Sequence, residues 1–236
     1  LKETTLHVAG FCSPQSPGVR VGGGWGSEQG MGVYRRNDCL VISDEIWSDL
    51  TLGNHQHIPT QSVSEDARNR TAAFYAPSKT FNLAGLIGSY HIIYNKYLRD
   101  RIGAKSSKSH YNEMNVLSMH ALIGAYQPEG YAWLDELREV LTGNVDYACD
   151  FIANHFDGGS CAKPGGTYML FLDCSEWCQA HGVSLQELEK RGWDVGVCWQ
   201  DGVMFKQPYS IRVNLALPLS RVKEAFDRLD RYVFNA

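Results

Sequence analysis

Three ionisable side chains are the best candidates for chemistry in this sequence of 236 residues. Lys79 closely follows a proline and stands beside Ser78 at the entry to an apolar segment. Asp44 ends one apolar stretch, and Arg212 lies inside another. A solvated surface position would be the ordinary interpretation of a single lysine. An amine, a carboxylate and a guanidinium together can bond covalently to a carbonyl ligand, hold a cationic ring nitrogen and bind a carboxylate.

The first half of the chain contains the segments that would position Asp44. Residues 38–46, DCLVISDEI, are typical of a short buried strand that ends in two carboxylates, and residues 86–94 are typical of a second strand. In open α/β sheets, ligands collect at the carboxyl ends of the strands, and Asp44 lies at such an end. Apolar residues at helical spacing predict a helix over residues 111–126.

Strands and helices continue to alternate in the second half, which predicts an α/β architecture. Strands are predicted over residues 165–173 and 209–217. Ser184 and Glu187 fit a capping box that opens a helix, and Gly192 is expected to end it. Two further helices are indicated by apolar stripes, which comprise Leu134, Leu137, Leu141, Val145, Ala148 and Ile152 in the first and Val222, Phe226, Leu229 and Val233 in the second.

One glycine-rich segment does not fit this alternation. Residues 19–34, VRVGGGWGSEQGMGVY, show neither helical nor strand periodicity, so we predict a loop. The glycine spacing also differs from that of a dinucleotide-binding turn, and no apolar helix follows on which a pyrophosphate would lie.

Composition excludes several classes of partner. The chain has 22 basic and 26 acidic residues and a net charge of −4, which provides no electrostatic surface for nucleic acid or an anionic membrane. It has no run of apolar residues long enough to span a bilayer. Seven irregularly spaced cysteines favour reduced thiols in a cytosolic protein. The pairs His55/His57 and Cys174/Cys178 lack further ligands at suitable spacing, so we expect no metal site.

Three segments in a fixed order resemble a known family: VISDEIWSDL, then APSKTFNLAGLIGSYHII, then SIRVNLALP. They are similar to the fold-type-I aminotransferase superfamily. Within it the chain is most similar to the cystathionine β-lyase branch of MalY and PatB, which contains related carbon–sulfur lyases. The resemblance begins at about Cys39 and implies an α/β fold in two parts. Residues 1–128 would be the latter part of the large domain with its mostly parallel sheet, and residues 129–236 the small C-terminal α+β domain.

The resemblance implies pyridoxal 5'-phosphate as the cofactor. By position, Lys79 is the lysine that forms the Schiff base with it, and Ser78 contacts its phosphate. Asp44 is the partner of the pyridine nitrogen, and a carboxylate there keeps the ring cationic. Arg212 would bind the carboxylate of the substrate. Once the substrate has displaced Lys79, the freed amine can take the α-proton.

Two further candidate cofactor-binding residues depart from the family pattern. Ser16 takes the place of an asparagine that hydrogen-bonds the ring oxygen of the cofactor. Trp47 takes the place of a histidine or tyrosine that bonds the same oxygen, and its indole N–H donates but cannot accept. The family also has a helix where this chain has its glycine-rich segment. A divergent natural loop and an out-of-frame translated patch over residues 18–34 explain that difference equally well.

In the family, the portion before these motifs supplies the ring-stacking tyrosine, a phosphate-binding loop and part of the dimer contact. The sequence contains none of this portion and resembles an N-terminally truncated chain. We therefore expect the 236-residue chain alone to bind the cofactor weakly and to turn over poorly.

The implied activity is a β-lyase reaction on cystathionine or cysteine-type amino acids that releases pyruvate, ammonia and a thiol. An aminotransferase would use every residue named above and is the alternative within the same class. A non-catalytic remnant of the fold is the alternative from another class. The resemblance further implies a small amino-acid substrate, a homodimer at full length and a cytoplasmic location, with neither nucleic acid nor membrane as a partner.

Overall fold

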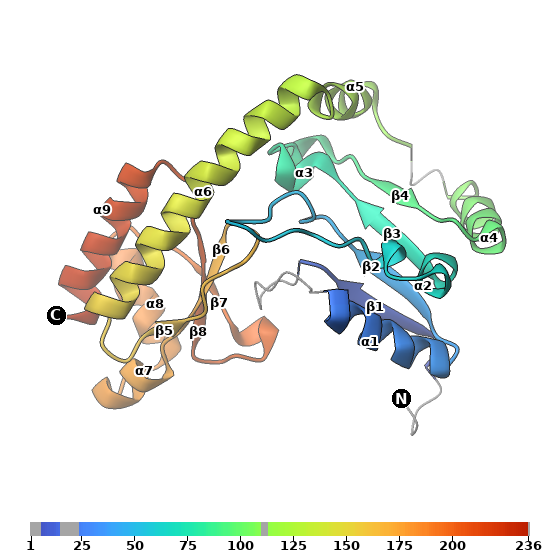
Figure 1. Ribbon diagram of the computed structural model, residues 1–236. Coiled ribbons are helices and arrows are strands. Elements are labelled where there is room, and N and C mark those ends of the chain that lie inside the picture. The colour runs from blue at the N-terminus through green and yellow to red at the C-terminus, as the bar shows by residue number, and fades with distance from the viewer. Residues whose placement is uncertain (1–5, 15–23, 110–112, 236) are drawn as a thin grey trace. The chain divides into compact units, whose positions relative to one another are not determined.

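The computed structural model describes residues 6–14, 24–109 and 113–235 (Figure 1). The described chain forms two compact units, the first ending at Glu136 and the second beginning at Leu137. The predicted boundary between family domains after residue 128 stays a prediction. None of the helices within the described ranges is both long and apolar enough to cross a membrane.

The first unit contains a four-stranded sheet in the order β1-β2-β3-β4. Its strands are β1 (Val8–Cys12), β2 (Leu40–Asp44), β3 (Thr71–Tyr75) and β4 (Tyr90–Ile92). The first three strands are parallel and β4 is antiparallel to β3, so the predicted strands over 38–46 and 86–94 are confirmed. The sequence analysis missed β1. In the register, Asp44 lies beside Cys12 on one side and Phe74 on the other.

Only one face of β2 is buried. Val41 packs with Met31 of α1 (Gly24–Arg36) and Ala67 of α2 (Glu65–Arg70). On the opposite face, 48% of Ile42 is exposed, so the predicted buried strand is buried on one face only. Asp44 shares this exposed face because side chains alternate along a strand.

Helix α1 corrects the loop predicted over residues 19–34. The structure places a helix over Gly24–Arg36, while residues 19–23 lie outside the described part. Glycine has a poor intrinsic helix propensity. It also has no side chain that could form part of an apolar stripe, so the segment shows no helical periodicity. The burial of Met31 against the sheet is a tertiary contact that offsets the poor propensity.

Three further helices of the first unit come after β3 in the chain. They are α3 (Pro77–Thr80), α4 (Lys96–Ser106) and α5 (Val116–Ala125). Helix α5 confirms the helix predicted over 111–126, although its apolar residues are not a buried stripe, since 72% of Leu117 is exposed. The next helix, α6 (Pro128–His155), begins in the first unit and continues into the second.

The second unit has an antiparallel sheet in the order β5-β6-β8-β7. Its strands are β5 (Ser160–Cys161), β6 (Met169–Asp173), β7 (Gln200–Asp201) and β8 (Ser210–Asn214), and its helices after α6 are α7 (Ser175–His181), α8 (Leu185–Asp194) and α9 (Leu219–Leu229). The predicted N-cap is confirmed, since the hydroxyl of Ser184 accepts the N–H of Glu187 at 3.2 Å. Helix α8 nevertheless ends at Asp194, two residues after the expected Gly192.

The core of the second unit lies between its sheet and helices α6 and α9, which run side by side (Figure 1). Phe151 of α6 and Phe156, the residue directly after that helix, contact Phe226 of α9, with ring centroids 5.6 and 5.9 Å away. The predicted stripes are buried as expected at Leu141, Val145, Ala148, Ile152, Val222, Phe226 and Leu229.

A buried asparagine fastens α6 to the segment after β8. The amide of Asn144 donates to the carbonyl oxygens of Leu215 and Leu217 at 2.9 and 2.8 Å. Asn144→Ala leaves both carbonyls without these donors, so we expect the free energy of unfolding to fall by roughly 2 kcal/mol. Asn154→Ala is the matched control, because Asn154 lies exposed on the same helix, where its amide donates to the carbonyl oxygen of Asp150. Urea unfolding followed by circular dichroism should show almost no loss for that control; equal losses would contradict the prediction.

Candidate active site

Lys79 lies on the short helix α3, directly after the carboxyl end of β3. Ala76 is extended, as the residue before a proline prefers, and Pro77 then starts the helix. Pro77 and Thr80 are buried, whereas Ser78 and Lys79 are partly exposed on the outer side of this turn. The ammonium nitrogen of Lys79 lies 5.6 Å from the ring centroid of Trp47, a cation–π contact.

Asp44 is the last residue of β2, the strand next to β3. Its Oδ1 accepts the N–H of Ile46 at 3.2 Å, and its main-chain oxygen accepts the N–H of Ser13 at 3.1 Å. Trp47 follows in the turn after the strand and is 6% exposed. The structure therefore places Asp44, Trp47 and Lys79 at the carboxyl ends of two adjacent parallel strands, where α/β folds bind ligands.

A hydrogen bond holds α3 against the turn that follows β2. The hydroxyl of Thr80 donates to Oδ2 of Asp49 at 2.9 Å. Because Lys79 is the preceding residue, this bond restrains the backbone that carries its amine. The sequence analysis did not select Asp49, and only the fold brings it to α3.

Two buried threonines of this unit allow a matched test of that bond. Thr80→Val removes the donor to a carboxylate, and we expect a loss of roughly 1.5 kcal/mol in the free energy of unfolding. The hydroxyl of Thr71 is equally buried, but it has no hydrogen-bond partner among the described residues. Thr71→Val replaces it by a methyl group and should be neutral or stabilising. Urea titrations of both variants check this, and a similar cost for both would contradict it.

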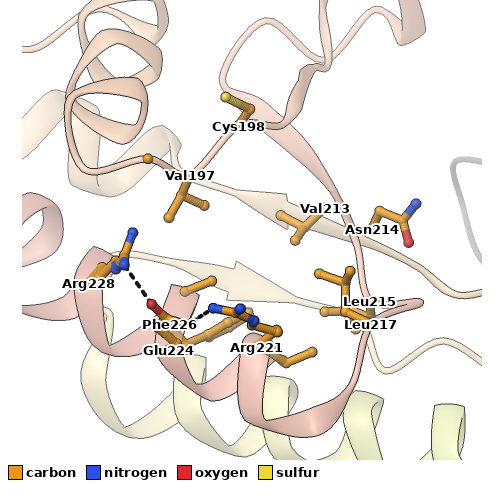
Figure 2. Close-up of a pocket in the computed structure, with 13 residues that line it drawn as sticks. Val197, Cys198, Val213, Asn214, Leu215, Leu217, Arg221, Glu224, Phe226 and Arg228 are labelled. Carbon is orange, nitrogen blue, oxygen red and sulfur yellow. Dashed lines mark hydrogen bonds and ion pairs between the residues drawn. The ribbon is translucent and has the colours of Figure 1, made fainter.

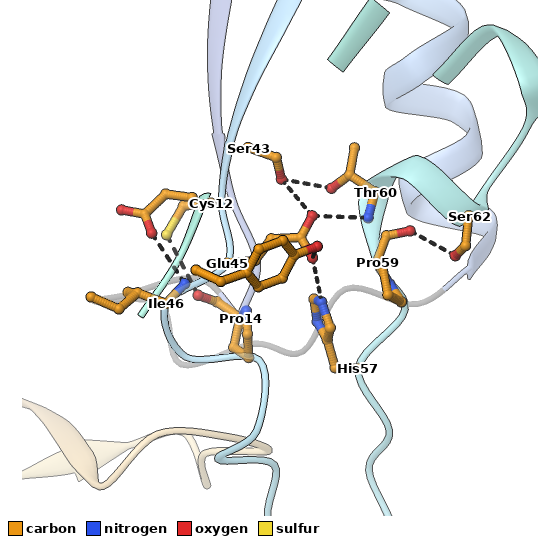
Figure 3. Close-up of polar contacts among 11 residues, drawn as sticks. Cys12, Pro14, Ser43, Glu45, Ile46, His57, Pro59, Thr60 and Ser62 are labelled. Atoms are coloured by element: carbon orange, nitrogen blue, oxygen red, sulfur yellow. Dashed lines mark hydrogen bonds and ion pairs between the residues drawn. The ribbon is translucent and has the colours of Figure 1, made fainter. Parts of the chain in front are cut away.

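Glu45 lies fully buried beneath this edge of the sheet and accepts four hydrogen bonds. Oε1 accepts the hydroxyl of Ser43 at 2.8 Å and the N–H of Thr60 at 3.0 Å. Oε2 contacts Nε2 of His57 at 2.7 Å and accepts the hydroxyl of Tyr75 at 2.9 Å. Figure 3 shows Glu45 bonded to Ser43, Thr60 and His57. The hydrogen bonds of this cluster connect β2, β3 and the segment between them, on the face of the sheet opposite the Asp44 side chain.

The surroundings of Glu45 keep it ionised. Burial acts to raise the pKa of Glu45, but the hydrogen bonds from His57, Ser43 and the Thr60 N–H outweigh burial and lower it. Burial also raises the pKa of Tyr75, and the adjacent negative charge of Glu45 raises it further. Tyr75 therefore stays a neutral donor, and its ring stacks on Tyr90 at 5.4 Å.

The role of Glu45 was not predicted from the sequence, and His57 was considered there only as a metal ligand. The alternation of side chains along a strand was the available signal. It puts Ser43 and Glu45 on the buried face and Asp44 on the opposite face. The contact of His57 with Glu45 joins residues 12 positions apart, and no local pattern indicates such a contact.

Arg212 and Ser16 are the remaining predicted site residues. Arg212 lies in β8 of the second unit, where it donates to Oε1 of Gln200 at 3.0 Å and lies 5.7 Å from the ring centroid of Phe205. Burial lowers the pKa of Arg212. Ser16 lies outside the described residues. The roles of both residues stay predictions.

The second unit also has a cavity of about 410 Å³ between β8 and α9 (Figure 2). Val213, Leu215 and Val222 contribute apolar walls, and Glu224 bonds to Arg221 and Arg228 at 2.8 and 2.6 Å. None of the described candidate site residues, which are Asp44, Trp47, Ser78, Lys79 and Arg212, lines it.

Comparison with known proteins supplies the family. The family model for class I and II aminotransferases matches residues 29–229, most of the chain. The chain belongs to the class I and II aminotransferase family. Cystathionine beta-lyase PatB of Bacillus subtilis is a relative, 33% identical over 194 residues that cover 81% of this chain and 48% of that protein. Protein MalY of Escherichia coli is 36% identical over 167 residues, which cover 69% and 41%.

Solved structures of this aminotransferase family confirm the predicted fold type. Cystalysin from Treponema denticola, which contains pyridoxal 5'-phosphate, matches with a TM-score of 0.88 and 28% identity over 96% of this chain and 57% of that one. A C–S lyase from Staphylococcus hominis with the same cofactor matches with a TM-score of 0.86 and 26% identity over 96% and 57%. The fold is α/β, of fold type I. The chain spans about half the length of the curated relatives that it matches.

Proposed function

We propose that the complete protein is a pyridoxal-phosphate-dependent lyase that breaks the carbon–sulfur bond of cystathionine or a similar cysteine-type amino acid. Its products would be pyruvate, ammonia and a thiol. The observation that carries this proposal is the position of Lys79 on α3 against Trp47, at the strand ends where Asp44 lies. Relatives with the names cystathionine β-lyase and C–S lyase support the choice of reaction.

The side chains at this edge fit the cofactor. A primary amine, a hydroxyl and a carboxylate, those of Lys79, Ser78 and Asp44, are all at least partly exposed there. They match the aldehyde, the phosphate and the pyridine nitrogen of pyridoxal 5'-phosphate. The indole of Trp47 is bulkier than the histidine or tyrosine of the family pattern, and it cannot accept a hydrogen bond.

Each residue then has a distinct task. Pyridoxal 5'-phosphate, when bound, withdraws electrons from the α-carbon of an attached amino acid. Asp44 holds a proton on the ring nitrogen, and Ser78 donates to the phosphate. Lys79 anchors the cofactor and, when free, its amine takes the proton from the α-carbon. Arg212 binds the α-carboxylate of the substrate through two parallel hydrogen bonds.

An aminotransferase is the second candidate. An aspartate aminotransferase of Bacillus subtilis is 27% identical over 211 residues, which cover 85% of this chain and 51% of that protein. The same residues would serve both reactions, and the fate of the substrate after proton removal distinguishes them. In either case we propose a homodimer in the cytoplasm with a small amino acid as its substrate.

The test uses the longest open reading frame that contains the chain. Purified enzyme loaded with pyridoxal phosphate is given cystathionine with and without 2-oxoglutarate. Pyruvate formation without the keto acid supports the lyase, and strict dependence on 2-oxoglutarate supports the aminotransferase. Failure to react with either, together with no borohydride-trapped cofactor on Lys79, would reject both and favour a non-catalytic remnant.

A further inference from the structure

Two cysteines of the second unit form a close pair that the proposed function does not use. Cys149 lies in the last two turns of α6 and Cys161 in β5. The thiol of Cys161 donates to Sγ of Cys149 across 3.9 Å, and both side chains are partly exposed. We propose that Cys149 and Cys161 are a redox-active dithiol that a hydroperoxide oxidises to a reversible disulfide.

The fold holds the two sulfur atoms together through a tight turn between α6 and β5. Gly158 has φ +78°, and a Cβ there would approach the backbone nitrogen of Trp177 to 2.8 Å, so a larger residue does not fit. After the turn, β5 pairs with β6 so that Cys161 lies beside Leu172. The pair is therefore a product of the backbone path, with one partner on a long helix and the other on a strand.

The two thiols differ in reactivity. The hydrogen bond from Cys161 lowers the pKa of Cys149, and the nearby ammonium of Lys163 lowers it further. Lys163 is itself held by Asp146 on α6 at 2.7 Å. Donation to Cys149 and burial raise the pKa of Cys161. Cys149 is thus suited to attack an oxidant as the thiolate, and Cys161 is suited to resolve the product.

The reaction balances with a hydroperoxide as the only co-reactant. The Cys149 thiol first loses its proton, and the thiolate attacks the outer peroxide oxygen. The O–O bond breaks, the departing alkoxide or hydroxide takes up that proton and leaves as an alcohol or water, and Cys149 becomes a sulfenic acid. The Cys161 sulfur then attacks the Cys149 sulfur. The S–S bond forms, the S–O bond breaks, and hydroxide leaves as water with the proton from Cys161. Two thiols lose two electrons in total, and the peroxide gains them.

Bond formation requires a local movement only. The sulfur atoms must close from 3.9 Å to about 2.05 Å. The product would link α6 to β5 and close the loop 149–161. No other element of the unit has to unfold, and a thiol reductant would restore the starting state.

The test is a map of thiols after exposure of the folded 236-residue chain to hydrogen peroxide. Remaining thiols are alkylated under denaturing conditions, and the chain is cleaved before aspartates for mass spectrometry. This cleavage separates Cys149 (146–149), Cys161 (157–172), Cys174 and Cys178 (173–193) and Cys198 (194–200) into different peptides. We expect peptides 146–149 and 157–172 to be linked, both thiols to be lost in equal amounts, and dithiothreitol to release them.

Single variants separate the two roles. Cys161→Ser should leave Cys149 as a sulfenic acid that dimedone traps, whereas Cys149→Ser should leave Cys161 open to alkylation. Cys198→Ser removes an exposed thiol outside the pair and should leave the link unchanged. Circular dichroism confirms that each variant is folded. Cys149 and Cys161 both remaining reduced while Cys198 is oxidised, or Cys161 linked equally to several cysteines, would overturn the proposal.

Discussion

Replacing Lys79 by alanine is expected to abolish covalent attachment of pyridoxal phosphate. Borohydride reduction of the wild-type chain with the cofactor should place a phosphopyridoxyl group on Lys79, because this amine lies at the strand ends beside Trp47. The alanine variant has no amine at that position. In the complete enzyme the loss of the α-proton base alone should lower turnover by roughly 100- to 10,000-fold. Peptide mapping of the reduced adduct measures the first effect and a pyruvate assay the second.

Lys108→Ala is the control for this experiment. Lys108 is exposed and lies in the same unit, so its removal should change neither the adduct nor the rate. An adduct of undiminished yield in Lys79→Ala, or labelling spread evenly over exposed lysines in the wild type, would show that the assigned site is wrong.

Replacing Glu45 by glutamine is expected to cost roughly 3 kcal/mol of the free energy of unfolding. In the wild type, each carboxylate oxygen of Glu45 accepts hydrogen bonds from two donors. A glutamine amide keeps one acceptor oxygen, and its NH₂ group would face the two donors that the other oxygen accepts. His57 and Tyr75, or Ser43 and the Thr60 N–H, would then lose their acceptor at a fully buried side chain. Because the cluster lies directly behind Asp44, we also expect weaker retention of the cofactor. Urea unfolding and cofactor titration measure the two effects.

The same variant should change the pH dependence of stability. The pKa of Glu45 is lower in the folded state than in the unfolded chain, where a glutamate titrates near about 4.3. Its contribution is therefore complete above that value and is lost as the pH falls through the folded-state pKa. Glu45→Gln should show a shallower loss of stability below about pH 4.3.

Glu136→Gln provides the comparison, since Glu136 is exposed on α6. We expect its unfolding free energy to follow that of the wild type at every pH. If Glu45→Gln kept the full acid dependence of the wild type, the hydrogen bonds to the Glu45 carboxylate would not be the source of the stability assigned to them.

Local sequence patterns predicted the helices and strands that have a clear apolar periodicity or an N-cap residue. The alternation around Arg212 predicted β8, and the hydroxyl of Ser184 predicted the start of α8. These signals are readable because alternation, helical spacing and capping depend on residues within a few positions of each other. The order of the motifs around Asp44 and Lys79 likewise indicated the family, which the comparisons confirmed.

Tertiary structure alone decided the features that depend on distant contacts. Helix α1 forms in a glycine-rich segment because Met31 packs on the sheet, and this contact leaves no local period. Glu45 meets His57 and Tyr75, 12 and 30 positions away, only because β2 and β3 are neighbours. The sequence determined which side chains are available for chemistry, and the fold decided which of them share a buried, hydrogen-bonded environment. The free energy of such an environment comes from desolvation and from partners that are remote in the chain.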